Sequence, residues 1–305
     1  MTSVDDTLSS LTPEDHRSAS DVPARAPLVS VTIPTLNAAG HLSRCLESLR
    51  RQSYTHLEVI VVDGGSRDDT PRLAAEAGAT VVTCPGGLLA ARCEGARLAR
   101  GDYVLLLDSD QVLEGTALAR AVALAEERGY DMLVLEEVSW RPRNWLQQLF
   151  AAHRRLVHRH VGPASLDPYG GTLLPRFFRR ALLTSALSTI PQEVVQRVVH
   201  HDHAIIYLEC WRLSRRVGLL RRAVFHQEPA SLRQVWRRNF RYGRSLAVFG
   251  PRAPYWDLVR RRDRRPWPRR LDWEDIPLLA QSALLMVLLR GAQWAGLAWQ
   301  RAGLP

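Results

Sequence analysis

The stretch that most constrains the fold is an apolar run closed by two acids, Tyr103-Val104-Leu105-Leu106-Leu107-Asp108-Ser109-Asp110. Its five apolar residues predict a strand buried on both faces, with two carboxylates one residue apart where the strand ends. In an open α/β sheet, ligands bind outside the carboxyl ends of the strands. Neighbouring acids repel each other, so we expect a divalent cation here, because magnesium and manganese suit hard oxygen ligands and also bind phosphate. By itself, the pair would fit a solvated turn as well.

The segments around this run alternate between strand and helix patterns. Strands are expected at residues 28–33, 57–62, 80–83, 102–107 and 132–136, with helices at 39–52, 71–77, 88–99, 116–127 and 145–158. This repetition is typical of an α/β fold, with a mostly parallel, Rossmann-like sheet flanked by helices on both faces. Residues 1–26 are polar and lack an apolar run, which predicts a disordered leader. We therefore expect a leader at 1–26, an α/β domain at 27–230 and a helical extension at 231–305.

Polar residues follow three of these strands at the same edge of the sheet. The first strand leads into Pro34-Thr35-Leu36-Asn37, the second into Asp63-Gly64-Gly65 and the fourth into Asp108-Ser109-Asp110. An Asp at a strand end can accept from a ribose hydroxyl or a base N–H, and glycines allow close backbone approach. One such motif would fit a plain turn, but three that converge favour a nucleotide site.

In combination, these residues resemble the family 2 glycosyltransferases with the GT-A nucleotide-sugar fold. The similarity runs roughly from Pro27 to Gly250, through residues 31–37, 61–70, 91–92 and 99–103, which lead into the Asp-Ser-Asp motif. The resemblance implies transfer of a sugar, with inversion, from a nucleotide-diphosphate donor to an acceptor hydroxyl or phosphate. It also implies a divalent metal cofactor, Mn²⁺ or Mg²⁺, and an enzyme of the EC 2.4 type.

The resemblance further implies roles for particular residues. The implied nucleoside contacts are Pro34, Thr35, Asn37, Asp63 and Arg92. Asp108 is implied to lie near the ribose, Ser109 belongs to the same donor-binding set, and Asp110 is implied to bind the metal on the diphosphate. Cys93 departs from the family, which often has Asn there.

The acceptor half is expected at His200-His201-Asp202-His203, where similar enzymes carry a carboxylate at the start of a helix. We expect Asp202 to act as the base that takes the proton of the acceptor hydroxyl. Alternatively, Asp202 caps the helix. Glu193 and Glu209 remain alternative bases. The three histidines could form a transition-metal site, although adjacent histidines on one turn are expected to diverge.

His226 follows a further strand, where similar enzymes place a His close to the metal or the diphosphate. We expect His226 to be a second metal ligand, the alternative being a structural histidine.

A helix is expected at 231–247, with Leu232, Val235, Trp236, Asn239 and Phe240 along one side and Arg233, Arg237, Arg241 and Arg244 along another. The arginines could neutralise a leaving diphosphate or a lipid phosphate, or form a solvated basic face.

The net charge of +10 comes entirely from arginine, since the chain has no lysine, and the excess gathers in residues 233–270. This pattern suggests phosphate groups, nucleic acid or an anionic membrane as a partner. The apolar segment 276–299 has an uncharged run of about 14 residues, shorter than the ~20 of a membrane span. We expect peripheral membrane contact and a lipid-linked or polyprenyl-phosphate acceptor, or else packing of this segment on the domain or a second subunit.

Four cysteines without a CxxC motif fit a cytoplasmic protein, with any membrane contact at the inner face.

Two other functions would each explain part of the sequence. A basic nucleic-acid-binding module would explain the aromatic residues among the arginines of 233–270, but the chain has no recognised motif of that kind and the reading ignores the acids at the strand ends. A sugar nucleotidyltransferase would need a glycine-rich loop after the first strand, where Pro34-Thr35-Leu36-Asn37 stands instead. We therefore expect a nucleotide-sugar donor, and no nucleic acid, as partner.

Overall fold

The computed structural model describes residues 25–159, 163–169, 171–264, 267 and 271–303. Residues 1–24 of the expected leader lie outside this range. The described part of the chain contains one eight-stranded sheet in the order β3-β2-β1-β4-β7-β6-β8-β5. The strands are β1 Val29–Thr35, β2 Leu57–Asp63, β3 Thr80–Thr83, β4 Tyr103–Leu106, β5 Gln111–Leu113, β6 Met132–Ser139, β7 Phe177–Arg179 and β8 Val217–His226.

The sheet is mixed rather than uniformly parallel. β7 runs antiparallel to both β4 and β6, and β5 runs antiparallel to β8, whereas the other pairings are parallel. The sequence pattern missed β5 and β7 because each has only three residues, too few to show a period. The five strands expected from the sequence are present, with ends shifted by three residues at most.

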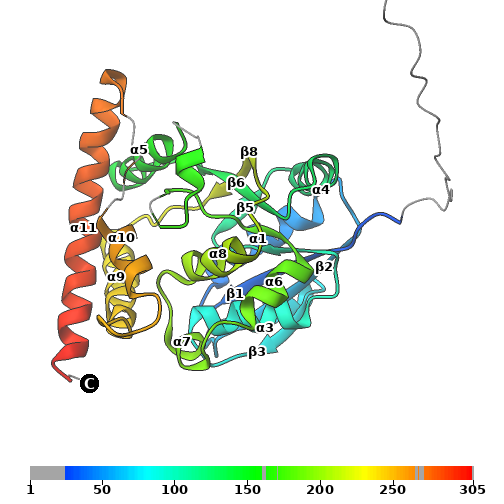
Figure 1. Cartoon of the computed structure of the whole chain (residues 1–305), viewed down its shortest axis with the longest axis horizontal. Coiled ribbons are helices and arrows are strands. Elements are labelled where there is room, and N and C mark those ends of the chain that lie inside the picture. The colour runs from blue at the N-terminus through cyan, green and yellow to red at the C-terminus, as the bar shows by residue number, and fades with distance from the viewer. Residues whose placement is uncertain (1–24, 160–162, 170, 265–266, 268–270, 304–305) are drawn as a thin grey trace, which may run out of the picture.

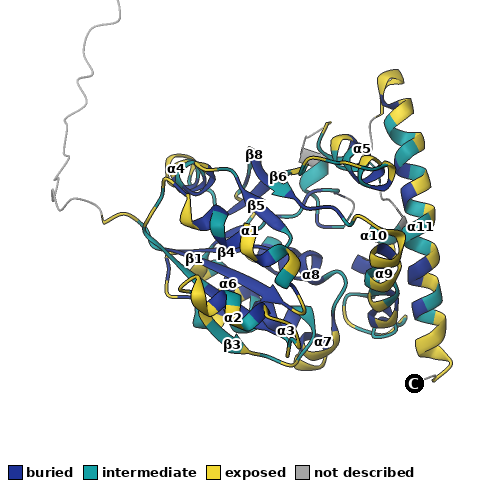
Figure 2. Cartoon of the chain, turned by 180° about the vertical axis from the view of Figure 1, so that it is seen from behind, coloured by how far each residue is buried: buried dark blue, intermediate teal, exposed yellow. Residues whose placement is uncertain are grey.

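Helices cover both faces of the sheet (Figure 1). They are α1 Ala39–Arg50, α2 Thr70–Glu76, α3 Leu88–Leu98, α4 Ala117–Arg128, α5 Trp145–Arg159, α6 Arg180–Leu187, α7 Gln192–Arg197, α8 Asp202–Leu213, α9 Leu232–Leu246, α10 Trp256–Arg264 and α11 Ile276–Arg301. Alternate residues of β4 serve the two faces, as the period of a strand dictates. Val104 and Leu106 pack with α3, α6 and α8, while Tyr103 and Leu105 pack with α1 and α4. Every residue of β1 and β4, in the middle of the sheet, is buried, and Figure 2 shows these strands in dark blue.

The C-terminal part packs against the domain as a layer of helices (Figure 1). α11 lies beside α9 and α5 and forms the outer edge of the molecule. α10 lies within the arginine-rich residues 233–270 of the expected helical extension. On α9 the expected apolar side is partly wrong, since Leu232 and Trp236 are exposed whereas Val235 and Asn239 are buried. The reason is that α11 covers α9 around Asn239, so residues further from that contact remain in solvent.

Two glycines allow α9 and α11 to approach closely. A Cβ atom on Gly243 would overlap the backbone of Gln293, and one on Gly296 would overlap the carbonyl oxygen of Phe240. By length and composition alone, the segment that contains α11 is long and apolar enough to cross a membrane. In the structure, one face of this helix is instead covered by α9 and α5.

Gly296→Ala is expected to destabilise the protein, because the added methyl group must push α9 and α11 apart. Overpacking of this kind costs about 1–3 kcal/mol, measured as the free energy of unfolding in urea. The matched control is Gly291→Ala on the same helix, where nothing lies within 4 Å of the new Cβ atom. The control should be neutral or stabilised by up to about 1 kcal/mol through helix propensity. Equal stability of the two variants would show that the helices are not packed this closely.

Candidate active site

The carboxyl ends of β1, β2 and β4 open into a pocket of about 390 Å³. Its polar side chains come from seven parts of the chain. They are Thr35 at the end of β1, Arg92 of α3, Asp108, Ser109 and Asp110 after β4, Arg176 before β7, Asp202 and His203 of α8, His226 of β8, and Arg238, Arg241 and Tyr242 of α9. Each of the three strand ends that the sequence predicted to converge contributes to the lining, through Pro34 to Leu36, Gly64, and Asp108 to Asp110.

Asp63 and Asn37 lie behind the lining and hold its loops in place. The Asp63 carboxylate accepts hydrogen bonds from the Thr35 hydroxyl at 2.9 Å, from the Ser66 hydroxyl at 2.6 Å, and from the amides of Gly65 and Ser66. Burial would raise the pKa of Asp63, but these hydrogen bonds hold it below its ordinary value. Asn37 has a left-handed backbone, with φ of 51°, and accepts a hydrogen bond from the Arg67 amide. Nucleoside contact by Asp63 and Asn37 stays a prediction.

Arg92 joins the donor and acceptor halves of the site. This buried guanidinium donates to Asp108 Oδ1 at 2.5 Å and to Asp202 Oδ2. Arg176 Nη1 lies 2.9 Å from the second oxygen of Asp108. Burial would raise the pKa of Asp108 and of Asp202, but the positive charge of Arg92, joined at Asp108 by that of Arg176, holds both below their ordinary values. Both acids are therefore ionised at neutral pH.

Asp202 is not the N-cap of α8, which excludes the capping alternative. The N-cap position belongs to His201, whose φ is 68°, and Asp202 is the first helical residue. Its carboxylate bonds to Arg92 and caps no backbone N–H group of α8. Asp202 therefore points into the site, where the sequence placed the base. Glu193 and Glu209 line neither this pocket nor the cavity next to it.

Asp110 and His226 face each other across the pocket, as their expected role as metal ligands requires. Asp110 Oδ1 lies 3.5 Å from His226 Nε2, and Asp110 Oδ2 lies 3.8 Å from Arg238 Nη1. His226 Nδ1 lies 3.3 Å from Glu228 Oε2, the arrangement in which a carboxylate orients a metal-binding histidine. Burial and Arg154 would lower the pKa of His226, but Asp110 and Glu228 raise it above its ordinary value. These oxygen and nitrogen donors would suit a manganese or magnesium ion.

Arg154, Arg176, Glu137 and Glu228 form a largely buried charge network next to His226, which could not be found from the sequence. Arg176 Nε lies 2.7 Å from Glu137, and Arg154 contacts both Glu137 and Glu228. The only local signal was Glu228, two residues after His226. The other three residues come from β6, α5 and the segment before β7. An ion pair between residues this far apart in the chain cannot be predicted from either residue alone.

Glu137 should make the free energy of unfolding fall at acidic pH. Burial would raise its pKa, but Arg176 and Arg154 lower it from 4.5 to about 2. Its stabilising contribution is therefore present above pH 4.5 and is lost as the pH falls toward 2. Between pH 7 and pH 3, Glu137→Gln should lose about 2 kcal/mol less unfolding free energy than the parent protein. The exposed Glu127→Gln is the control, and an unchanged acid profile of Glu137→Gln would contradict the ion-pair network.

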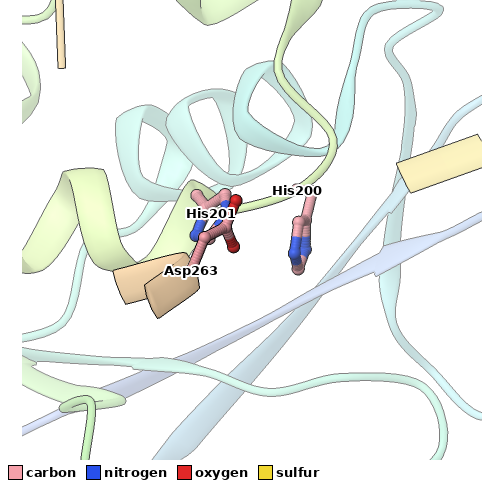
Figure 3. Close-up of side chains that lie close together, drawn as sticks. All are labelled: His200, His201 and Asp263. Carbon is pink, nitrogen blue, oxygen red and sulfur yellow. The ribbon is translucent and has the colours of Figure 1, made fainter. Parts of the chain in front are cut away.

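The histidine cluster divides in two. His203 Nε2 lies 2.7 Å from Arg176 Nη1 on the pocket side, whereas His200 and His201 lie with Asp263 of α10 (Figure 3). The expectation that adjacent histidines diverge is wrong for His200 and His201, whose ring centroids are 4.1 Å apart. The left-handed backbone of His201 brings the rings together.

The His200, His201 and Asp263 cluster has the donor atoms of a metal site within 4.8 Å of one another. However, Arg290 Nη1 lies 2.8 Å from Asp263 Oδ1 and already balances its charge. Burial would raise the pKa of Asp263, but His201 and Arg290 lower it below its ordinary range. These contacts favour an ion pair here rather than a transition-metal site.

A second cavity, of about 480 Å³, adjoins the first, and Arg176, Asp202 and His203 line both. Its walls come from α5, α10, α11 and the start of α8. One part is apolar, lined by Phe150, Val157, Leu173, Leu174, Met286 and Leu289, and another is polar, lined by His200, His201, Arg262, Asp263 and Arg290. Asp202 therefore lies between the pocket and this second cavity. A base that acts between a donor site and an acceptor site would occupy such a position.

Solved structures with the same fold define the class. The fold is that of the GT-A glycosyltransferases. S. aureus TarS residues 1–349, in complex with UDP-GlcNAc, aligns with a TM-score of 0.53 and 16% identity over 90% of this chain and 92% of that chain. The mannosyltransferase PcManGT from Pyrobaculum calidifontis, in complex with GDP-Man and Mn²⁺, aligns with a TM-score of 0.53 and 21% identity over 92% and 76% of the two chains.

Sequence comparison finds relatives among the same class of enzyme. Residues 30–169 match the model described as Glycosyl transferase family 2. A PGL/p-HBAD biosynthesis glycosyltransferase of Mycobacterium tuberculosis is 36% identical over 128 residues, which are 39% of this chain and 50% of that protein. Chondroitin synthase of Escherichia coli is 40% identical over 100 residues, 31% of this chain and 15% of that protein. The matches thus span half or less of these relatives.

Proposed function

We propose that this chain transfers a sugar from a nucleoside-diphosphate donor to an acceptor, with inversion and with the help of a divalent metal. The observation that carries the proposal is the pairing of Asp110 with His226 at the mouth of a pocket built from three strand ends. The family match of residues 30–169 and the donors bound by proteins of the same fold support it. They also weigh against the nucleic-acid-binding and sugar-nucleotidyltransferase alternatives.

In the proposed reaction, Pro34, Thr35 and the loop at Gly64 hold the nucleoside, and Asp108 with Ser109 lies toward the ribose. Asp110 and His226 hold Mn²⁺ or Mg²⁺, which when bound supplies positive charge to the leaving diphosphate. Arg238 and Arg241 of α9 line the same pocket and add positive charge where the diphosphate leaves. α9 belongs to the extension at 231–305, so we propose that the extension completes the donor site of the domain at 27–230.

Asp202 is proposed as the base. It is ionised, buried, and placed between the two cavities, so it can accept a proton from an acceptor hydroxyl that enters from the larger one. A single displacement of this kind inverts the anomeric centre, because the acceptor attacks from the face opposite the leaving group. A phosphate acceptor is already ionised and would not need the base. Asp202→Asn should therefore suppress transfer to hydroxyl acceptors more than transfer to phosphates.

The larger cavity supports a proposal for the acceptor. An apolar wall beside the guanidinium of Arg262 suits a molecule that has both an apolar part and an anionic group. We therefore propose a lipid-linked or polyprenyl-phosphate acceptor, used by an enzyme that works in the cytoplasm at the inner face of the membrane.

A thermal-shift panel tests the donor half. UDP-, GDP- and dTDP-sugars are each added with Mn²⁺, with Mg²⁺ or with EDTA. One donor should raise Tm by a few degrees in the presence of metal and much less in EDTA, since ligand at 100 times Kd stabilises by about 2.7 kcal/mol. Single-stranded oligonucleotides serve as the comparison ligand. If no donor shifts Tm, or if oligonucleotides bind with a steep salt dependence while the donors do not, the proposed function is wrong.

A further inference from the structure

A third cavity, of about 550 Å³, lies next to the proposed metal ligands and shares no lining residue with the pocket that holds them. Gln227 and Glu228 line this cavity and directly follow His226 in the chain. The backbone N–H of Gln227 also donates to the carbonyl oxygen of Asp110 at 2.8 Å. The other walls come from the start of α1, the loop between β6 and α5, and the starts of α5 and α9. The cavity is within the usual size of small-molecule sites, roughly 300–1,000 Å³.

Three arginines in the wall of this cavity have no acidic partner. Arg44 of α1 and Arg141 and Arg143 of the loop before α5 are exposed, and none of them forms an ion pair among the described residues. Arg44 Nη1 donates to the neutral amide oxygen of Gln227 at 3.0 Å. The guanidinium of Arg141 lies over the ring of Trp140, 5.1 Å from its centroid. Each arginine therefore keeps N–H donors that no group of the protein uses.

Two helices begin at the wall of the cavity and add positive charge to it. α5 and α9 have 15 residues each, and neither has an acid in its first turn. Their caps are neutral, Asn144 for α5 and Ser231 for α9. The N-terminus of a helix carries a partial positive charge and attracts anions. The start of α1 contributes less, because the Asp68 carboxylate accepts a hydrogen bond from the Ala39 amide at 3.2 Å.

The other polar groups of the wall are already bonded within the protein. Asn144 donates to the carbonyl oxygen of Ala230 at 2.9 Å, and Gln147 donates to that of Glu228 at 3.0 Å. Glu228 is the only acid among the described residues of the wall, and its carboxylate lies 2.5 Å from Arg154 Nε. The wall is therefore held in place by its own hydrogen bonds, and the groups left to bind a ligand are cationic donors.

We propose that this cavity binds a sugar that carries a phosphate or a carboxylate. Guanidinium groups recognise both of these oxyanions through charge-assisted hydrogen bonds, and helix N-termini favour the same ligands. The cavity has room beyond the anion, and the partly exposed Trp140 provides a large apolar surface against which a sugar ring can pack. The choice of a sugar rests on the proposed function, whereas the need for an anion rests on the charges of the wall alone.

Calorimetric titration tests the proposal. The full-length protein, in EDTA and without nucleotide, is titrated with glucose 1-phosphate, glucuronate or glucose at low and at high salt. At least one of the two anionic sugars should bind about tenfold or more tightly than glucose, and more weakly at high salt because ions screen the arginines. The tighter of the two shows whether the cavity prefers a phosphate or a carboxylate.

Two sets of variants locate the binding. Arg141→Asn/Arg143→Asn should weaken the binding of the anionic sugar about tenfold or more. Asparagine tolerates the left-handed backbone of Arg141, whose φ is 42°, so this variant should fold. Ser231→Asp keeps an acceptor at the start of α9 but places a negative charge there, and should weaken binding about threefold with no loss of stability.

Matched controls separate local from general effects of charge. Arg128→Asn/Arg197→Asn removes the same charge from the exposed ends of α4 and α7, and Ser185→Asp adds the same charge to an exposed position of α6. Both should bind the anionic sugar like the parent protein. The proposal is overturned if neither anionic sugar binds more tightly than glucose, if the cavity variants bind like the parent protein, or if the controls lose as much affinity.

The donor panel keeps this proposal separate from the proposed function. The rise in Tm that a nucleotide-sugar gives with Mn²⁺ should be the same in the cavity variants as in the parent protein, because the two sites share no lining residue. If anionic sugars bind in EDTA but no nucleotide-sugar raises Tm, the proposed function fails alone. If a nucleotide-sugar raises Tm but no anionic sugar binds, this inference fails alone.

Discussion

Asp110→Asn should reduce sugar transfer by about a thousandfold or more while leaving the fold intact. The carboxylate is the only charged oxygen that faces His226 Nε2 within 4 Å in the described structure, and the neutral amide is a much poorer ligand for a hard divalent cation. If the proposed metal were lost, only the arginines of α9 would remain to balance charge on the leaving diphosphate.

Stability should change little in Asp110→Asn, because the contacts of Asp110 with His226 and Arg238 are long, at 3.5 and 3.8 Å. The measurements are kcat with the donor found in the panel, its dependence on Mn²⁺ concentration, and Tm. Asp69→Asn, an exposed acid in the loop after β2, is the control and should transfer like the parent protein. Transfer by Asp110→Asn at the parent rate would disprove the assignment of the metal ligand.

Arg92→Met should destabilise the protein by about 3–5 kcal/mol, the cost of leaving buried acids without their partner. Arg92 is 1% exposed and balances Asp108 and Asp202, of which only Asp108 has a second arginine. In the parent protein both acids have lowered pKa values. Their stabilising contribution is therefore present above about pH 4 and is lost as the pH falls through the folded pKa values.

The loss of stability in Arg92→Met should depend on the negative charge that the variant leaves unpaired. The double variant Arg92→Met/Asp202→Asn, which removes one unpaired charge, should recover part of the lost stability. Arg92→Lys keeps the charge but cannot span both acids with a planar fork, so it should fall between the two. Urea unfolding at pH 7 measures each variant. Arg97→Met, on the exposed face of α3, is the control and should unfold like the parent protein. If Arg92→Met equals this control, Arg92 does not hold the two halves together.

Local signals were enough for the donor half of the site. Thr35, Asp108, Ser109 and Asp110 follow strands whose apolar runs are visible in the sequence, and parallel strands bring their carboxyl ends to one edge. Arg92 was found through the resemblance alone. In the structure it contacts two acids of the protein, and its contact with a nucleoside stays a prediction.

The acceptor half could not be assembled in this way. Asp202 was singled out with the correct position, but its partner Arg92 lies 110 residues away. Arg176, Glu137 and Arg154 carried no signal, because a charged residue in a strand or helix is usually solvated. His201 with its positive φ, and the three-residue strands β5 and β7, are held by the surrounding tertiary structure rather than by local preference.

By itself, the sequence determined the alternation of strands and helices, the acids that end the fourth expected strand, and the apolar character of the last helix, since all three are patterns of neighbouring residues. Only the tertiary structure decided which acids are paired, that α10 and α11 wall a cavity beside Asp202, and which face of α11 remains open. Those outcomes depend on contacts between residues far apart in the chain, where burial and charge balance are set by the whole fold.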